Sequence, residues 1–498
     1  MGDLLRKLRR RFGEGEGGAG APQPNRGPQP AAAVRSEPRP AGRGPDAEEP
    51  AAAHGPGQAA EDTPAEQARE EPAAPDRQDV LEGLRRRIAA LDKRWKDGGA
   101  QTPVAARRAA AFEILPGRMV ETRQGPVRMI AETVARGSGH GRFAVGDFAT
   151  EPSRLAPLAG LYRLRTPPRP EGLIFLDTET TGLAGGAGTL PFLVGLAWIE
   201  GGDLRVEQLF LDHPRHEPAL VAHLRERLSA FDHVVTYNGR AFDIPLLQNR
   251  FVLHRTPWPP LDASLDLLTG ARRLHRRHLA DRSLASIERN VLGFFREDDV
   301  PGAEIPGIYH RFLFTGTTER LAGVIRHNAW DVVAMAALLG LHARLLSTSP
   351  ADHELDPAVD LALGELRYAT GELDAAAGSL ARAVARCERS GAPPAPGAVW
   401  ADALLWLARA HRRRGRHDEA AACWRRILAA LPDHGAAHLA LAKYHEHRSR
   451  RWEEAERHAR AAAAAGAEDA GAAERRAARL AASRLTVTSN RPAVPRRS

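Results

Sequence analysis

Residues 173–183 read LIFLDTETTGL, and the interpretation of the rest of the chain starts from this stretch. Four apolar residues precede Asp177, which predicts a buried strand that carries a carboxylate to the edge of a sheet. Side chains alternate along a strand, so Asp177 and Glu179 lie on one face and can contact the same ion. A surface turn is the alternative reading of this motif when it is taken alone.

Two later motifs add two more carboxylates. TYNGRAFDIPLL, residues 236–247, places Asp243 after a strand and a loop that begins at Asn238, at the start of a helix. RHNAWDVVAM, residues 326–335, places Asp331 in a long apolar helix with His327 on the same helical face. Asp243 has an alternative role in stabilising exposed helix N–H groups. His327 has an alternative role as a structural partner of Asp331.

Four converging carboxylates repel one another and raise each other's pKa unless a cation neutralises them. Mg²⁺ and Mn²⁺ prefer oxygen ligands. Two such ions about 4 Å apart hold the attacking and leaving oxygens of a phosphodiester. We therefore predict a two-metal site with Asp177, Glu179, Asp243 and Asp331 as ligands, and with a terminal sugar beside the turn at Thr180. His327 is suited to orienting or deprotonating the attacking water.

The apolar pattern predicts an α/β domain with a mixed sheet. Three consecutive strands are expected at 172–177, 192–199 and 204–211, followed by alternating helices and strands to a closing helix at about 318–346. FEILPGRMVETRQGPVRMIAETVA, residues 112–135, predicts a β-hairpin that turns near Gly125.

Sequence composition divides the chain into five segments. Residues 1–76 are expected to be disordered, with a possible basic helix at the start, because Gly, Pro, Ala and charged residues dominate them. Residues 77–170 form a helix and a small β extension, 171–347 the main domain, 357–484 an all-α repeat region and 485–498 a loose tail. The repeats have a period near 34 residues, with Ala420 and Ala455 at matching positions.

Net charge and cysteine content indicate the class of partner and the cellular location. The formal net charge of +8 favours polyanionic partners. The two cysteines, Cys387 and Cys423, offer neither a disulfide framework nor a CxxC metal site, so a cytoplasmic location is expected. No uncharged apolar run is long enough to predict a membrane span.

An arginine-rich stretch, ARRLHRRHLADRSLASIER, follows the last predicted strand. Its arginines suit phosphate contacts, and a solvated helix face is the alternative. We predict nucleic-acid contacts from Thr180, Asn238, Arg272, Arg273, Arg276 and Arg277. Asp266, near the end of that strand, is a reserve candidate for a fifth carboxylate.

The three carboxylate motifs, together with LDLL and REDDVPGAEIP, resemble the YprB-type RNase H-like family within the DEDD exonuclease superfamily. The resemblance covers about residues 172–346. It implies an RNase H-like fold and 3′–5′ exonuclease activity, with Asp177, Glu179, Asp243 and Asp331 as the acidic positions. The fifth superfamily residue is usually Tyr four positions before the last Asp, or His five before it. Here His327 stands at the four-residue spacing, which leaves its role as general base open.

We therefore expect a divalent-metal-dependent nuclease of DNA or RNA, with tetratricopeptide-like repeats that bind a protein partner. A scaffold protein with weak or no catalysis is one alternative. A structure-specific endonuclease is another, because the same site supports internal cleavage.

Overall fold

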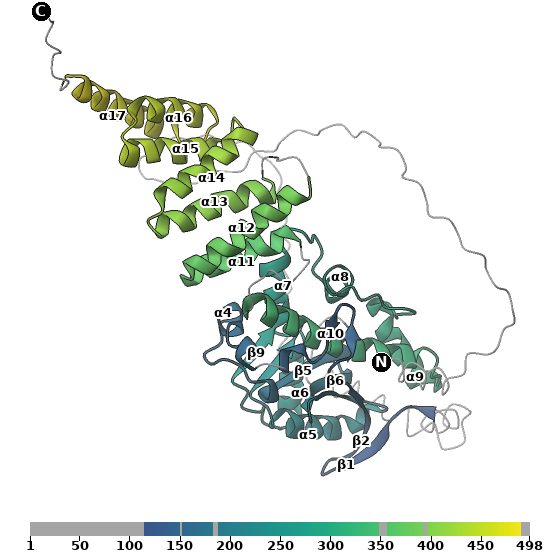
Figure 1. Cartoon of the computed structure of the whole chain (residues 1–498). Coiled ribbons are helices and arrows are strands. Elements are labelled where there is room, and N and C mark those ends of the chain that lie inside the picture. Colours follow the sequence, from purple (N-terminus) through teal and green to yellow (C-terminus); the bar gives the residue numbers. More distant parts are fainter. Residues whose placement is uncertain are drawn as a thin grey trace, which may run out of the picture. The chain divides into compact units, whose positions relative to one another are not determined.

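The computed structural model describes residues 114–149, 152–182, 188–347, 356–391, 395 and 397–489 (Figure 1). The expectations for residues 1–76, for the helix that follows them and for the last residues of the tail lie outside this part of the chain.

One seven-stranded mixed sheet forms the centre of the first domain, as the sequence predicts. Its order is β1 (Arg118–Thr122), β2 (Gly125–Val134), β7 (Asp203–Phe210), β6 (Pro191–Glu200), β5 (Leu173–Thr180), β8 (His233–Thr236) and β9 (Ala263–Asp266). The neighbouring pairs β1–β2, β2–β7, β7–β6 and β6–β5 are antiparallel, whereas β5–β8 and β8–β9 are parallel. The predicted hairpin is confirmed, and β2 joins it to the same sheet through β7.

Strand β5 contributes to a different core on each face of the sheet. Leu173 and Phe175 pack in a cluster with the C-terminal half of the closing helix. Ile174 and Leu176 pack in the opposite cluster, against helices of the other layer. This alternation puts Asp177 and Glu179 on the face of Leu173 and Phe175. The carboxylates therefore face the closing helix.

In the described part of the chain, the α-helices of this domain are α4 (Leu158–Tyr162), α5 (Glu217–Leu228), α6 (Asp243–Leu253), α7 (Leu267–His275), α8 (Leu284–Ile287), α9 (Ile305–Thr315) and α10 (Leu321–Ser347). Helix α9 was not predicted. Its buried residues Ile305, Ile308, Tyr309 and Phe312 follow the helical spacing, but Pro306 and Gly307 interrupt the pattern at its start. Proline is compatible with the first helical turn, where its missing N–H has no partner to lose.

Helix α10 is the one described helix that is long and apolar enough to cross a membrane. Of its most apolar window, 83% is buried inside the protein. The helix packs along β5, β6 and β7, and thus serves as the central core helix of the domain.

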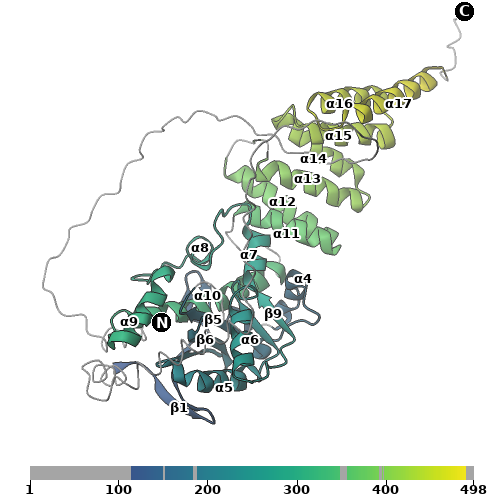
Figure 2. The same ribbon diagram turned by 180° about the vertical axis from the view of Figure 1, so that it is seen from behind.

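The C-terminal region is all-helical, as the repeat pattern predicts, with consecutive helices packed on one another (Figure 2). Its helices are α11 (Pro357–Thr370), α12 (Leu373–Arg389), α13 (Val399–Arg413), α14 (His417–Ala430), α15 (Gly435–Tyr444), α16 (Trp452–Ala464) and α17 (Ala470–Ser489). Gly371 ends α11 in the left-handed conformation, at a φ of 88°, where a side chain would be strained. Helix α17 continues past residue 484, where the loose tail was expected to begin.

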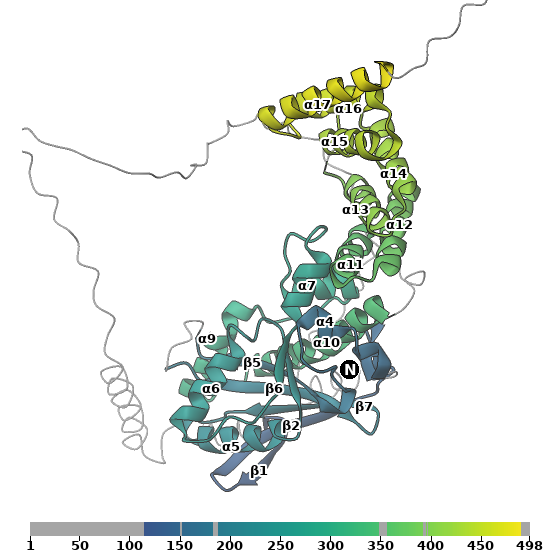
Figure 3. The ribbon, with the colours of Figure 1, turned by 90° about the vertical axis from the view of Figure 1, so that its left-hand side faces the viewer.

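Helix α11 also belongs to the core of the first domain. Val359 and Leu363 are buried in the cluster that contains α10 and Phe175. Arg367 donates to the carbonyl of Leu346 at the end of α10, at 3.1 Å. Helices α7 and α11 lie side by side (Figure 3). The first repeat helix is therefore fixed to the α/β domain by apolar packing and by a buried guanidinium group.

Candidate carboxylate site

Asp177 is held by a buried amide network. Asn328, fully buried on α10, donates to the Asp177 carboxylate at 2.8 Å, and Gln208 on β7 donates to the Asn328 amide oxygen at 2.8 Å. Gly195 on β6 makes this packing possible, because a Cβ there would lie 2.3 Å from the Asn328 oxygen. Asn328 is adjacent to His327 in the sequence, but its role was not predicted, since only the fold brings it to β5.

Asp243 is the first residue of α6 and is buried. The hydroxyl of Thr178, between the two β5 carboxylates, donates to its Oδ1 at 2.5 Å. Burial raises the pKa of Asp243 to about 6, and the hydrogen bond from Thr178 opposes the rise. The structure therefore links Asp243 to the strand that carries Asp177 and Glu179.

Asp331 and His327 on α10 lie opposite Glu179 on β5. His327 Nε2 lies 3.4 Å from Asp331 Oδ2 and 3.9 Å from Glu179 Oε1. Within the described part of the chain, these three residues form the group whose ligand atoms, all within 4.8 Å of one another, could hold a metal ion.

An arginine that the sequence reasoning missed pairs with Asp331. Arg296, in the loop before α9, contacts Asp331 Oδ1 at 2.5 Å, Glu288 Oε2 at 2.6 Å and Asp299 Oδ2 at 3.3 Å. Burial would lower its pKa, but Asp331 and Glu288 outweigh that effect and raise the pKa. Arg296 uses only one oxygen of Asp331, so the other remains directed at His327.

Asp299 orients His327. Its Oδ1 lies 2.8 Å from His327 Nδ1, which leaves Nε2 directed at Asp331 and Glu179. Burial would lower the pKa of His327, but the hydrogen bond to Asp299 and the charge of Asp331 raise it instead. Asp299 lies in the REDDVPGAEIP motif, so the resemblance contained the signal for it, although no role was assigned to it.

The two β5 carboxylates hold their protons unusually strongly. Burial, and then the charge of Asp331, raises the pKa of Glu179 to about 8. Burial and the charges of Asp331 and Asp243 raise the pKa of Asp177 well above its usual range, against the hydrogen bond from Asn328. Burial and the neighbouring carboxylates thus act in the same direction, and for Glu179 they outweigh the opposing effect of His327 and Arg296.

The structure gives three other candidate residues local roles. Thr180 donates to the carbonyl of Gly182 at 2.9 Å. Asn238 has a positive φ of 65°, and its N–H donates to Asp266 at 2.8 Å. Asp266, the reserve candidate for a fifth carboxylate, caps α7 by accepting from the N–H of Leu268 at 3.1 Å.

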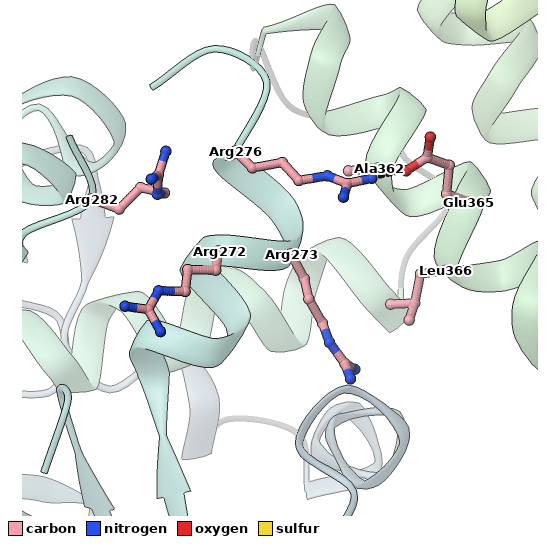
Figure 4. A pocket seen from close by; sticks show the side chains of 7 residues that line it. All are labelled: Arg272, Arg273, Arg276, Arg282, Ala362, Glu365 and Leu366. Carbon is pink, nitrogen blue, oxygen red and sulfur yellow. Dashed lines mark hydrogen bonds and ion pairs between the residues drawn. The ribbon is translucent and has the colours of Figure 1, made fainter. Parts of the chain in front are cut away.

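The four predicted arginines lie on or directly after α7, and Figure 4 shows three of them. Arg277 pairs with Glu365 at 2.5 Å and with Asp402 at 2.7 Å. Arg276 pairs with Glu365 at 2.8 Å, and Arg273 donates to the carbonyl of Leu161 at 2.6 Å. Arg272 is exposed, which leaves it free to meet a ligand.

Comparison with known proteins identifies the family of the domain that carries these residues. Residues 174–342, which contain the four carboxylates and His327, match the RNase_H superfamily, and residues 401–444 match the tetratricopeptide repeat. The Bacillus subtilis (strain 168) protein named "Uncharacterized protein YprB" is 33% identical over 283 residues. That similarity spans 56% of this chain and 66% of the relative, just under two thirds of its length. The superfamily domain supports a nuclease-type activity. The chain therefore belongs to the YprB-type RNase H-like family and carries C-terminal tetratricopeptide repeats.

Proposed function

We propose that this protein is a divalent-metal-dependent nuclease that hydrolyses phosphodiester bonds of DNA or RNA as a 3′–5′ exonuclease. One observation carries the proposal. Burial, together with the charges of Asp331 and Asp243, raises the pKa values of Asp177 and Glu179, because the four carboxylates from β5, α6 and α10 lie near one another.

The residues fit Mg²⁺ or Mn²⁺, for which the proposal assumes two ions. All four ligands offer carboxylate oxygens, which these hard ions prefer. Because burial and the charge of Asp331 raise the pKa of Glu179 to about 8, a bound cation would favour the ionised form of this carboxyl group. When bound, the ions would stabilise the negative charge on the attacking and leaving oxygens. The protein's part is to fix the ligands, which the Asn328 amide does for Asp177 and the Thr178 hydroxyl does for Asp243.

His327 is proposed as the general base. Asp299 holds Nδ1, so the second ring nitrogen, Nε2, points at Asp331 and Glu179, where a water would be activated. The same pattern of a base oriented by a carboxylate occurs in other hydrolytic sites. Asp299 acts through His327 and is therefore a positioning residue. Arg296 limits the repulsion at Asp331 without covering both of its oxygens.

The test is cleavage of single- and double-stranded DNA and RNA, labelled at either end, with Mn²⁺, with Mg²⁺ and with EDTA. A 3′–5′ exonuclease releases a 3′ label at once and shortens a 5′-labelled strand stepwise. Asp177→Asn should abolish cleavage and keep the fold, whereas Glu171→Gln, an exposed carboxylate before β5, should cleave normally. Early internal fragments would instead establish an endonuclease. A folded protein that cleaves none of these substrates would refute the proposal.

The cytoplasmic location and a protein partner for the repeats also remain proposals. The first is supported by the two cysteines, which are both free thiols. The second is supported by the stacked helical pairs, an architecture that presents extended binding surfaces.

A further inference from the structure

Two cavities rich in arginine lie between the loop that precedes α6, at Asn238, and the first repeat helix, α11. One cavity, of about 470 Å³, is lined by Tyr237, Asn238, Arg272, Arg282 and neighbouring residues. A second, of about 650 Å³, is lined by Arg272, Arg273, Arg276 and Arg282 together with α11. Arg272 and Arg282 line both cavities, so the two cavities adjoin, and we call them together the arginine groove.

The charges within the groove leave an excess of guanidinium groups. Its acidic lining residues are Glu365 and Asp281. Glu365 is occupied by Arg276, and also by Arg277 just outside the lining. Asp281 accepts from the hydroxyl of Ser283 at 2.7 Å. In Figure 4, Arg276 reaches toward Glu365, whereas Arg272 extends away from it. Arg272 is therefore the clearest free phosphate donor in the groove.

The groove lies close to the carboxylate site. Asn238 lines it, and the chain from Asn238 to Asp243 spans at most about 18 Å even if fully extended. This distance corresponds to about five stacked nucleotides. The loop is anchored, because Asp266 accepts from the N–H of Asn238 at 2.8 Å and Gly239 approaches Thr236 too closely for a Cβ. A strand whose end is at the carboxylates would thus reach the groove within a few nucleotides.

We propose that the arginine groove holds the phosphate backbone of a single nucleic-acid strand a few nucleotides from the scissile bond, and that α11 forms one wall of this substrate site. This inference rests on the proposed nuclease function for its direction. Cavities of this size match sites for small ligands and single nucleotides rather than a duplex. The first repeat helix then has a role in substrate binding, in addition to any partner of the later repeats.

The experiment measures binding of the full-length protein to fluorescent oligonucleotides of about three and about 20 nucleotides, in EDTA so that nothing is cleaved. Strands of deoxythymidine and of uridine are both used. Arg272→Glu should weaken binding of the long strand about tenfold or more, as expected for a lost charge-assisted hydrogen bond. Its salt dependence should fall by about 0.7 in log–log slope, the value for one phosphate contact on a single strand. Binding of the short strand should be unchanged.

Two matched variants make the comparison specific. Arg289→Glu has the same change of charge on an exposed arginine of the same stretch that lines neither cavity, and it should bind as the parent does. Arg272→Lys should retain most of the affinity. Equal affinity of Arg272→Glu and Arg289→Glu for the long strand would overturn the proposal that the arginine groove binds the strand. So would a polyglutamate peptide that binds in an Arg272-dependent manner while the oligonucleotide does not.

Binding and cleavage fail independently. If Arg272→Glu weakens binding but the protein cleaves no substrate, the proposal of strand binding in the groove stands and the proposed nuclease function is rejected. Cleavage without an Arg272 effect would keep the nuclease and reject the groove.

Discussion

Replacing Glu179 by Gln should stabilise the metal-free protein above pH 5. The pKa of Glu179 rises from 4.5 to about 8 in the folded protein, first through burial and then through the charge of Asp331. The folded state therefore holds the proton more tightly than the unfolded state. The stability that this carboxyl contributes is fully present below pH 4.5 and is lost as the pH rises through 8. A glutamine keeps the shape of the side chain and never ionises.

The size of the effect follows from the shift. Each pH unit between the two pKa values costs the parent about 1.4 kcal/mol of unfolding free energy. From pH 5 to pH 7 the parent should lose about 3 kcal/mol relative to Glu179→Gln. For a domain of this size, that difference corresponds to roughly 6–12 °C in Tm.

Thermal unfolding by circular dichroism in EDTA, from pH 5 to pH 9, measures this difference. The comparison must be between variants, because the buried histidines impose a pH dependence of the opposite sign. Glu171→Gln, at an exposed site, should follow the parent. With Mn²⁺ at about 100 times its Kd, the parent should gain about 2.7 kcal/mol and Glu179→Gln clearly less. A Tm difference that does not change with pH, or an equal gain from Mn²⁺, would refute the electrostatic account of the cluster.

Three further predictions follow from the contacts. Asp299→Asn should move the acidic limb of the pH–rate profile to lower pH by weakening the proton affinity of His327, and an unmoved limb would mean that His327 does not act as the base. Burial lowers the pKa of the fully buried His342 from 6.5 to about 3, so the stability that this residue contributes is present above pH 6.5 and is lost on acidification. In urea denaturation, His342→Gln should therefore reduce the fall in unfolding free energy between pH 7 and pH 5. A chain that ends at Ser347 should have a free energy of unfolding at least about 3 kcal/mol lower than one that ends at Gly391, because it loses the buried side chains of Val359 and Leu363 on α11. Equal Tm values for the two truncated chains would show that α11 is dispensable to the core.

The local chemistry of the site was largely predictable. A buried run that ends in Asp177 and Glu179 defines the strand, its face and its exposed end, because alternation is a property of any strand. The one-turn spacing of His327 and Asp331 likewise follows from helix geometry alone. Their convergence was predictable only through the family resemblance, since no spacing in the sequence relates residue 177 to residue 331.

The partners of these residues were not predictable from periodicity. Asn328 and Arg296 look like ordinary polar residues in the sequence, and their roles depend on which strand and which carboxylate lie opposite. Helix α9 was missed because Pro306 and Gly307 obscure its start. The arginines of α7 formed a visible stripe, but only packing against α11 decides that Arg277 pairs with repeat carboxylates while Arg272 stays exposed.

The sequence by itself predicted most of the element types, the mixed sheet and the repeat region, and it supplied the four carboxylates as candidates. These depend on short-range patterns of apolar and polar residues, which act over a few residues whatever the rest of the chain does. The tertiary structure alone decided how the carboxylates are held, that Asp299 orients His327, and that α11 packs on the α/β domain to complete a charged groove. These features arise from contacts between residues far apart in the chain, and burial and charge at such contacts are set only when the whole domain has folded.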